Sequence, residues 1–65
     1  MRWKATIEFE FVSYDEKSTK ESYMGSGMSE EGAIMDAWES MGKYAGSILV
    51  ETKEVKAIST ATKEP

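Results

Sequence analysis

The chain has 65 residues, the size of one domain, and a net charge of −4 at neutral pH. It contains no cysteine and no histidine, which excludes disulfides and removes the most common metal ligand and the usual proton shuttle near pH 7. No apolar run approaches the roughly 18 residues of a membrane span and no apolar signal core follows the N-terminus, so we expect a cytoplasmic protein that does not contact a membrane.

Negative charge is concentrated in one internal segment. Five acids and no bases lie between Glu21 and Gly42, whereas the rest of the chain holds seven acids and eight bases. The net charge is therefore the sum of about −5 in this segment and about +1 in the rest of the chain. Such a segment on a small domain indicates a basic partner.

Residues 3–12 predict a strand. Apolar and polar residues alternate throughout this stretch, so one face is buried and the other is solvated. The apolar set is Trp3, Ala5, Ile7, Phe9 and Phe11.

A polar stretch at 13–18 predicts a hairpin loop, after which residues 19–24 predict a second strand. This strand has few large apolar residues, as is typical of an edge strand. Gly25 and Gly27 are expected to end it or to place a bulge in it.

Residues 30–45 predict a helix. Ser29 is expected to be its N-cap, and Glu30 and Glu31 follow where negative charge favours the helix dipole. The apolar side is expected to carry Ile34, Ala37, Trp38, Met41 and Ala45. Asp36, Glu39 and Lys43 are expected on the other side. Gly46 is expected to end the helix in the left-handed conformation.

Residues 47–58 predict a third strand, in which Ile48 and Val50 have one parity and Val55 and Ala57 the other. Either a bulge within 51–54 lets both pairs face the core, or the strand leaves the core after Thr52. Residues 59–65 lack an apolar pattern and predict a flexible tail, so the compact domain is expected to span 1–58.

These elements predict an α+β fold of the order β-β-α-β. We expect a three-stranded sheet in the order 2-1-3, with strand one in the centre and one helix packed on one face. Trp38 is expected at the centre of the helix, against Ile7 and Phe9 or Phe11. The other face of the sheet should carry Lys4, Thr6, Glu8, Glu10 and Val12.

A sheet this small has two open edges and a thin core. We therefore expect a homodimer, formed through an outer strand edge and the open sheet face.

Two interpretations of the acidic segment remain open: a solvated helix face, or a docking surface for a basic protein groove. For the second, the candidate partner-binding residues are Glu30, Glu31, Asp36, Glu39, Met35, Glu21, Glu8 and Glu10. Methionine is included because it adapts to irregular binding surfaces.

No catalytic residue, metal ligand or cofactor is predicted, so we expect a protein that is not an enzyme. The acidic chain argues against direct contact with nucleic acid. The glycine loop at 25–29 is followed by Glu30 and Glu31, which would repel a phosphate.

The alternating first strand, the hairpin and the Ser29-Glu30-Glu31 opening of an alanine-containing helix resemble small acidic phage and prophage proteins that inhibit a host protein, some of them by mimicking DNA. The helix opening also resembles that of the HicB antitoxin fold, from which this chain departs by lacking a third strand before the helix. The acidic segment and the absence of catalytic residues lead us to expect a basic partner in the bacterial host cytoplasm, such as a nucleoid protein, a polymerase or a nuclease. The alternative function is a structural module that assembles with itself.

Overall fold

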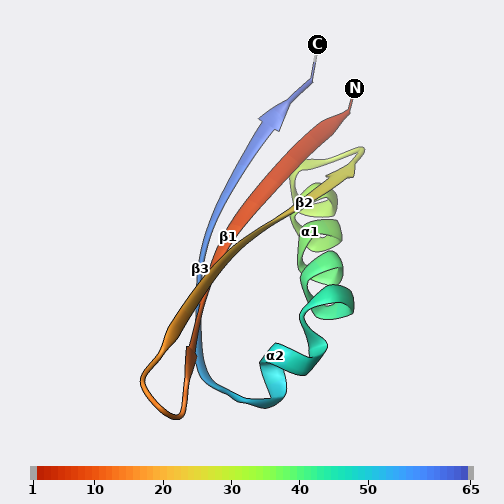
Figure 1. Cartoon of the computed structure of the whole chain (residues 1–65). Coiled ribbons are helices and arrows are strands. Elements are labelled where there is room, and N and C mark those ends of the chain that lie inside the picture. Colours follow the sequence, from red (N-terminus) through yellow and green to blue (C-terminus); the bar gives the residue numbers. More distant parts are fainter. Residues whose placement is uncertain (1, 65) are drawn as a thin grey trace.

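A computed structural model describes residues 2–64. It contains three strands and two helices (Figure 1). In chain order they are β1 (Trp3–Ser13), β2 (Ser18–Gly27), α1 (Glu30–Tyr44), α2 (Gly46–Val50) and β3 (Thr52–Lys63). The sheet has the order β2-β1-β3, and both pairings of β1 are antiparallel. The predicted α+β class and strand order are therefore confirmed.

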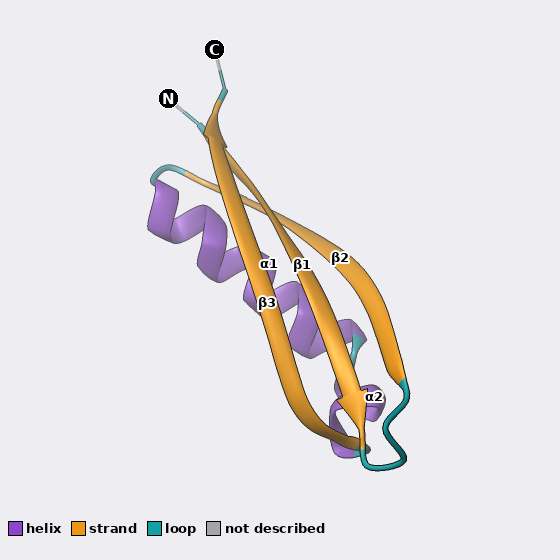
Figure 2. Ribbon diagram, turned by 90° about the vertical axis from the view of Figure 1, so that its left-hand side faces the viewer, coloured by secondary structure: helices purple, strands orange, loops and turns teal. Residues whose placement is uncertain are grey.

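The molecule has two layers. Both helices lie on one face of a long twisted sheet, and no other element of residues 2–64 covers the opposite face (Figures 1 and 2). The ends of β1 and β3 that lead to the two termini lie side by side at one end of the molecule, whereas the β1–β2 hairpin and α2 lie at the other (Figure 1). The odd-numbered side chains of β1 point at the helices, and those of Ala5, Ile7, Phe9 and Phe11 are buried, as the alternation predicts.

The hairpin turn is held by hydrogen bonds of Ser13 and Asp15. The Ser13 N–H donates to the Lys17 carbonyl at 2.8 Å, and the Lys17 N–H donates to the Asp15 carboxylate at 3.3 Å. The Ser13 hydroxyl also donates to that carboxylate and, with the Lys17 N–H, lowers the pKa of Asp15 below its usual value. Glu16 takes up a left-handed conformation with φ 68°. The turn is therefore ordered.

Strand β2 is longer than predicted, because it continues through Gly25 to Gly27, and these two residues pair with Ala5 and Trp3. The prediction that the glycines end the strand is confirmed for Gly27 and wrong for Gly25, and the register with β1 shows no bulge at either. Their role is steric, since a Cβ at Gly25 would lie 2.3 Å from the backbone nitrogen of Ala37. The missing side chains let α1 rest directly on the β2 backbone.

Helix α1 begins where predicted. Ser29 is the N-cap, and its hydroxyl accepts a hydrogen bond from the Gly32 N–H at 3.1 Å. The residues buried against the sheet are Ala33, Ala37 and Met41, followed by Ala45 at the C-cap.

The prediction that Trp38 is the central helix residue is wrong. Its side chain is 42% exposed, although its ring meets that of Phe9 edge to face with centroids 4.9 Å apart. Helix and sheet approach each other too closely at Ala33 and Ala37 for a large side chain, so Trp38 lies at the margin of the interface.

The predicted third strand is wrong at its start. Residues 46–50 form α2, and Ile48 and Leu49 pack against the core from that helix. Gly46 begins α2 instead of ending α1 in a left-handed conformation, and no glycine in the described chain has a positive φ. The pairing with β1 does shift by one residue around Lys53, within the segment where a bulge was predicted.

The end of the third strand is also wrong. Strand β3 continues past Ile58 to Lys63, and residues 59–63 pair with residues 3–7 of β1. Beyond the strand, the Glu64 N–H donates to the Arg2 carbonyl at 2.7 Å. The expected tail at 59–65 is thus strand up to Lys63, and Pro65 lies outside the described residues.

Candidate functional site

The acidic residues predicted on the helix are all exposed on α1. Glu31, Met35, Glu39 and Lys43 follow one another at a spacing of four, which aligns them in one row along the helix. Met35 is 63% exposed between two of the carboxylates. We call the set Glu30, Glu31, Met35, Asp36 and Glu39 the acidic helix surface.

Asp36 differs from the other acids of this surface because it has a partner in the fold. Its carboxylate accepts a hydrogen bond from the Ser26 N–H of β2 at 2.9 Å. This bond joins the helix to the outer edge of the sheet. Asp36 therefore contributes negative charge and also holds α1 in place.

Glu21 lies on the helix side of the sheet, where β2 pairs it with Phe9. The Tyr23 hydroxyl donates a hydrogen bond to its carboxylate. This bond, helped by partial burial and by the negative charge of Glu21, raises the pKa of Tyr23 above its usual value. Glu21 is thus engaged by its neighbour.

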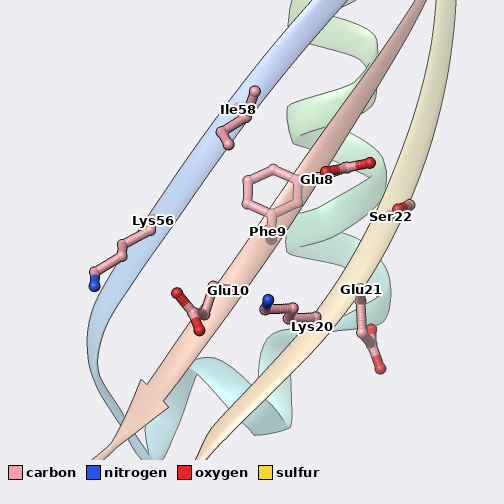
Figure 3. Close-up of a pocket in the computed structure, with 8 residues that line it drawn as sticks. All are labelled: Glu8, Phe9, Glu10, Lys20, Glu21, Ser22, Lys56 and Ile58. Atoms are coloured by element: carbon pink, nitrogen blue, oxygen red, sulfur yellow. The ribbon is translucent and has the colours of Figure 1, made fainter.

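The structure does not bring Glu8 and Glu10 together with the helix acids. Both lie on the open face of the sheet, so the sheet separates them from α1. There they line a shallow hollow of ≈ 460 Å³ with Lys20 and Lys56 (Figure 3). Register places Glu10 directly opposite Lys20 on one side and Lys56 on the other.

This open-face hollow has mixed charge. Three glutamates, Glu8, Glu10 and Glu21, and two lysines, Lys20 and Lys56, line it, together with the exposed side chain of Ile58. Opposite charges at cross-strand distance compensate each other. It therefore does not extend the negative surface of the helix.

Sequence reasoning missed the surface of β3. Its helix-side residues Val55, Ala57 and Ser59 are exposed, because α1 packs against β2 more closely than against β3. We call these three residues the β3 strip. Residues 55–58 were predicted as strand with Val55 and Ala57 facing the core, and the lack of an apolar pattern at 59–65 predicted a tail.

A second hollow lies at the hairpin end, between the turn and α2. Exposed Tyr14 and Val50 line it with Ile48 and charged turn residues, and it opens widely to solvent. Its apolar lining resembles a contact surface more than a site for chemistry.

Within residues 2–64, no three acidic side chains gather closely enough to hold a metal ion. Neither helix that the structure describes is long and apolar enough to cross a membrane.

Comparisons with protein-family models, curated proteins and solved structures found no match. The function is therefore argued from the surfaces themselves.

Proposed function

We propose that this chain is a non-enzymatic interaction protein whose acidic helix surface docks on a basic surface of a bacterial host protein and inhibits or modulates it. The basic surface would be a nucleic-acid-binding site, as in a nucleoid protein, a polymerase or a nuclease. The acidic helix surface would then act as a mimic of DNA.

The observation that supports the proposal is the exposure of the acids on a single element. The excess charge of the sequence resides largely on α1, where Glu30, Glu31 and Glu39 reach solvent and the first base is Lys43. Exposed carboxylates on a rigid helix can meet arginine and lysine side chains with little rearrangement.

Spacing also favours mimicry of a phosphate backbone. Residues four apart on a helix are separated by about 6 Å along its axis, close to the roughly 6.8 Å rise of two nucleotides in one DNA strand. Glu31 and Glu39 are eight residues apart, so their separation along the helix axis would match the rise of about four nucleotides. Met35 lies between them as a flexible apolar contact.

Capture of partners from a bacterial lysate at low and high salt tests the proposal. The partner should bind at low salt and dissociate as salt rises, since exposed ionic contacts are screened. A variant with Glu30, Glu31 and Glu39 all changed to Lys should lose the partner. Asp36 is left unchanged in this variant because it holds β2.

The matched control changes Glu8, Glu51 and Glu54 to Lys. These residues are equally acidic and exposed but lie away from α1, so the net charge changes by the same amount. Binding should survive in this control. Equal loss in both variants, or binding that does not respond to salt, would contradict the acidic helix surface as the docking site.

A second candidate function is a module that assembles with itself. The exposed β3 strip favours it, because most of β3 is exposed on both faces of the sheet and one long edge has no strand beside it in the described chain. Light scattering over a dilution series tests this function. A monomer mass at every concentration would rule it out.

A further inference from the structure

The outer edge of β3 offers backbone groups that can pair with another strand. It runs for 12 residues, Thr52–Lys63, and contains no proline. Its register with β1 is unbroken from Glu54 to Lys63, so this stretch is a regular strand. A long regular edge of this kind is a template for pairing with a second strand.

The opposite edge of the sheet is less available. Near the end of β2 the Ser26 N–H is already bound by the Asp36 carboxylate, and α1 lies against Gly25 and Gly27. The same close contact draws α1 toward β2 and leaves the β3 strip uncovered. The available edge and the uncovered strip therefore belong to the same strand.

We infer that β3 pairs antiparallel with β3 of a second copy of this chain, about a two-fold axis at Ala57. This inference deepens the self-assembly proposal and rests on it. Directly opposite residues must point to the same face of the sheet, so a two-fold pairing places one residue opposite its own copy. Like charges then exclude some registers, and the number of paired residues selects among the rest.

Five centres, Val55 to Ser59, were compared by which charges they oppose. A centre at Lys56 sets Lys56 against itself and one at Ile58 sets Lys53 against Lys63, whereas one at Ser59 opposes no like charges within β3 and pairs residues 55–63 only. Like charges directly opposite are destabilising.

The centres at Val55, Ala57 and Ser59 avoid such pairs, and the Val55 centre also sets Glu54 against Lys56 of the second copy. The Val55 centre pairs only residues 52–58, whereas the Ala57 centre pairs residues 52–62 and forms more backbone hydrogen bonds. The Ala57 centre also sets Lys56 against Ile58 and Val55 against Ser59 of the second copy, and it joins the two β3 strips side by side.

The product would be one antiparallel sheet of six strands, three from each copy. Rotation about an axis perpendicular to the sheet keeps both α1 helices on the same face. The joined β3 strips then form the floor of a channel between the two helices. The exposed side chains of Trp38 from both copies border it.

Cysteine cross-linking tests the pairing directly, because the chain has no cysteine of its own. At the two-fold axis, position 57 and its copy would have Cα atoms about 4.5–5.5 Å apart, within the range of a disulfide. Ala57→Cys should therefore give a covalent dimer under mild oxidation.

The matched control is Ala61→Cys, on the same face of the same strand. In the Ala57 register, residue 61 and its counterpart in the second copy would be eight residues apart along the strands, roughly 26 Å. The Ala61→Cys variant should therefore run as a monomer under denaturing conditions. Val55→Cys should also fail to cross-link, whereas a Val55 centre would make it the cross-linking variant.

Two substitutions at Ile58, which is 68% exposed, test the register in solution without introducing a cross-link. In the Ala57 register, residue 58 of each copy lies opposite Lys56 of the other copy. Each substitution therefore changes two cross-strand pairs. Ile58→Glu should tighten the dimer and Ile58→Lys should weaken it, each by about twofold to thirtyfold in the dissociation constant.

The outcomes separate the two proposals. A monomer at all concentrations overturns both self-assembly and the β3 pairing. A dimer in which Ala57→Cys cross-links no better than Ala61→Cys overturns the β3 pairing alone, as does a dimer that responds equally to both substitutions at Ile58.

Discussion

Gly25 of β2 lies directly beneath Ala37 of α1. A Cβ on Gly25 would lie 2.3 Å from the Ala37 nitrogen and 2.5 Å from the carbonyl oxygen of Ala33. Both atoms belong to the backbone, so no rotation of a side chain could relieve the overlap. This contact sets the distance between helix and sheet, and through it the position of Trp38 and the exposure of β3.

Gly25→Ala should therefore destabilise the protein by about 2–3 kcal/mol, the upper range for overpacking a well-packed contact. Gly42→Ala is the matched control, since a Cβ there meets nothing within 4 Å. It should stabilise α1 by up to about 1 kcal/mol through helix propensity. Urea denaturation measures both, and equal midpoints for the two variants would contradict the close contact.

Truncation of Trp38 should cost less than truncation of Phe9. Phe9 is almost fully buried, so Phe9→Ala should cost about 3–5 kcal/mol. Trp38 is partly exposed and keeps mainly its edge-to-face contact with Phe9, so Trp38→Ala should cost about 2 kcal/mol. Thermal unfolding of the two variants checks the order. A larger loss for Trp38→Ala would place Trp38 in the core after all.

Asp36→Ala should destabilise the protein by about 1 kcal/mol, the net value of one hydrogen bond between a side chain and the backbone. The Ser26 N–H would lose its partner and α1 its tie to β2. Glu39→Ala, on the exposed side of the same helix, should have little effect. Chemical denaturation of both variants measures the difference, and equal stability would show that the bond contributes nothing.

Stability should fall at alkaline pH because of Tyr23. The hydrogen bond to Glu21 raises the pKa of Tyr23 above its ordinary value of 10.0. A pKa that is higher in the folded than in the unfolded protein gives a stabilisation that is complete below pH 10 and is lost as pH rises through the folded pKa.

Tyr23→Phe should remove this alkaline loss, which urea midpoints between pH 8 and 12 would show. Tyr14→Phe serves as the control, because Tyr14 is exposed in the turn. If the alkaline loss of stability persisted in Tyr23→Phe and vanished in Tyr14→Phe, Tyr14 and not Tyr23 would be its cause.

Sequence patterns correctly predicted the strands and helices that have one buried face and one face in solvent. Strand β1 has one face under the helices and the other face open, so its alternation places Ala5, Ile7, Phe9 and Phe11 in the core correctly, whereas Trp3 is only half-buried. The Ser29 cap and the two glutamates likewise mark the start of α1, because capping is a local interaction.

The patterns failed where a residue's role depends on a distant partner. Glycine is typical of a strand end, and only the approach of α1 shows why Gly25 lies within a strand. Large size made Trp38 look central, whereas the close contact of helix and sheet selects alanine there. Strand β3 lacks a buried face and so carries no alternating pattern beyond residue 58.

The candidate site was predicted in part. The exposed acids of α1 follow from helical spacing, so their location could be read from the sequence. The separation of Glu8 and Glu10 from them depends on which face of the sheet the helix covers. The second roles of Asp36 and Glu21 depend on contacts with Ser26 and Tyr23 that spacing along the chain does not reveal.

The central place of β1 also orders the events of folding. Its pairing with β2 closes loops of at most 24 residues, as between Trp3 and Gly27, whereas its pairing with β3 reaches from Trp3 to Lys63. Longer loops cost more entropy to close, so the hairpin and α1 should form first and β3 should add last. Contacts made after the rate-limiting step govern how fast a protein opens. If β3 adds after the rate-limiting step, we expect its loss from the edge of the sheet to set the lifetime of the folded chain.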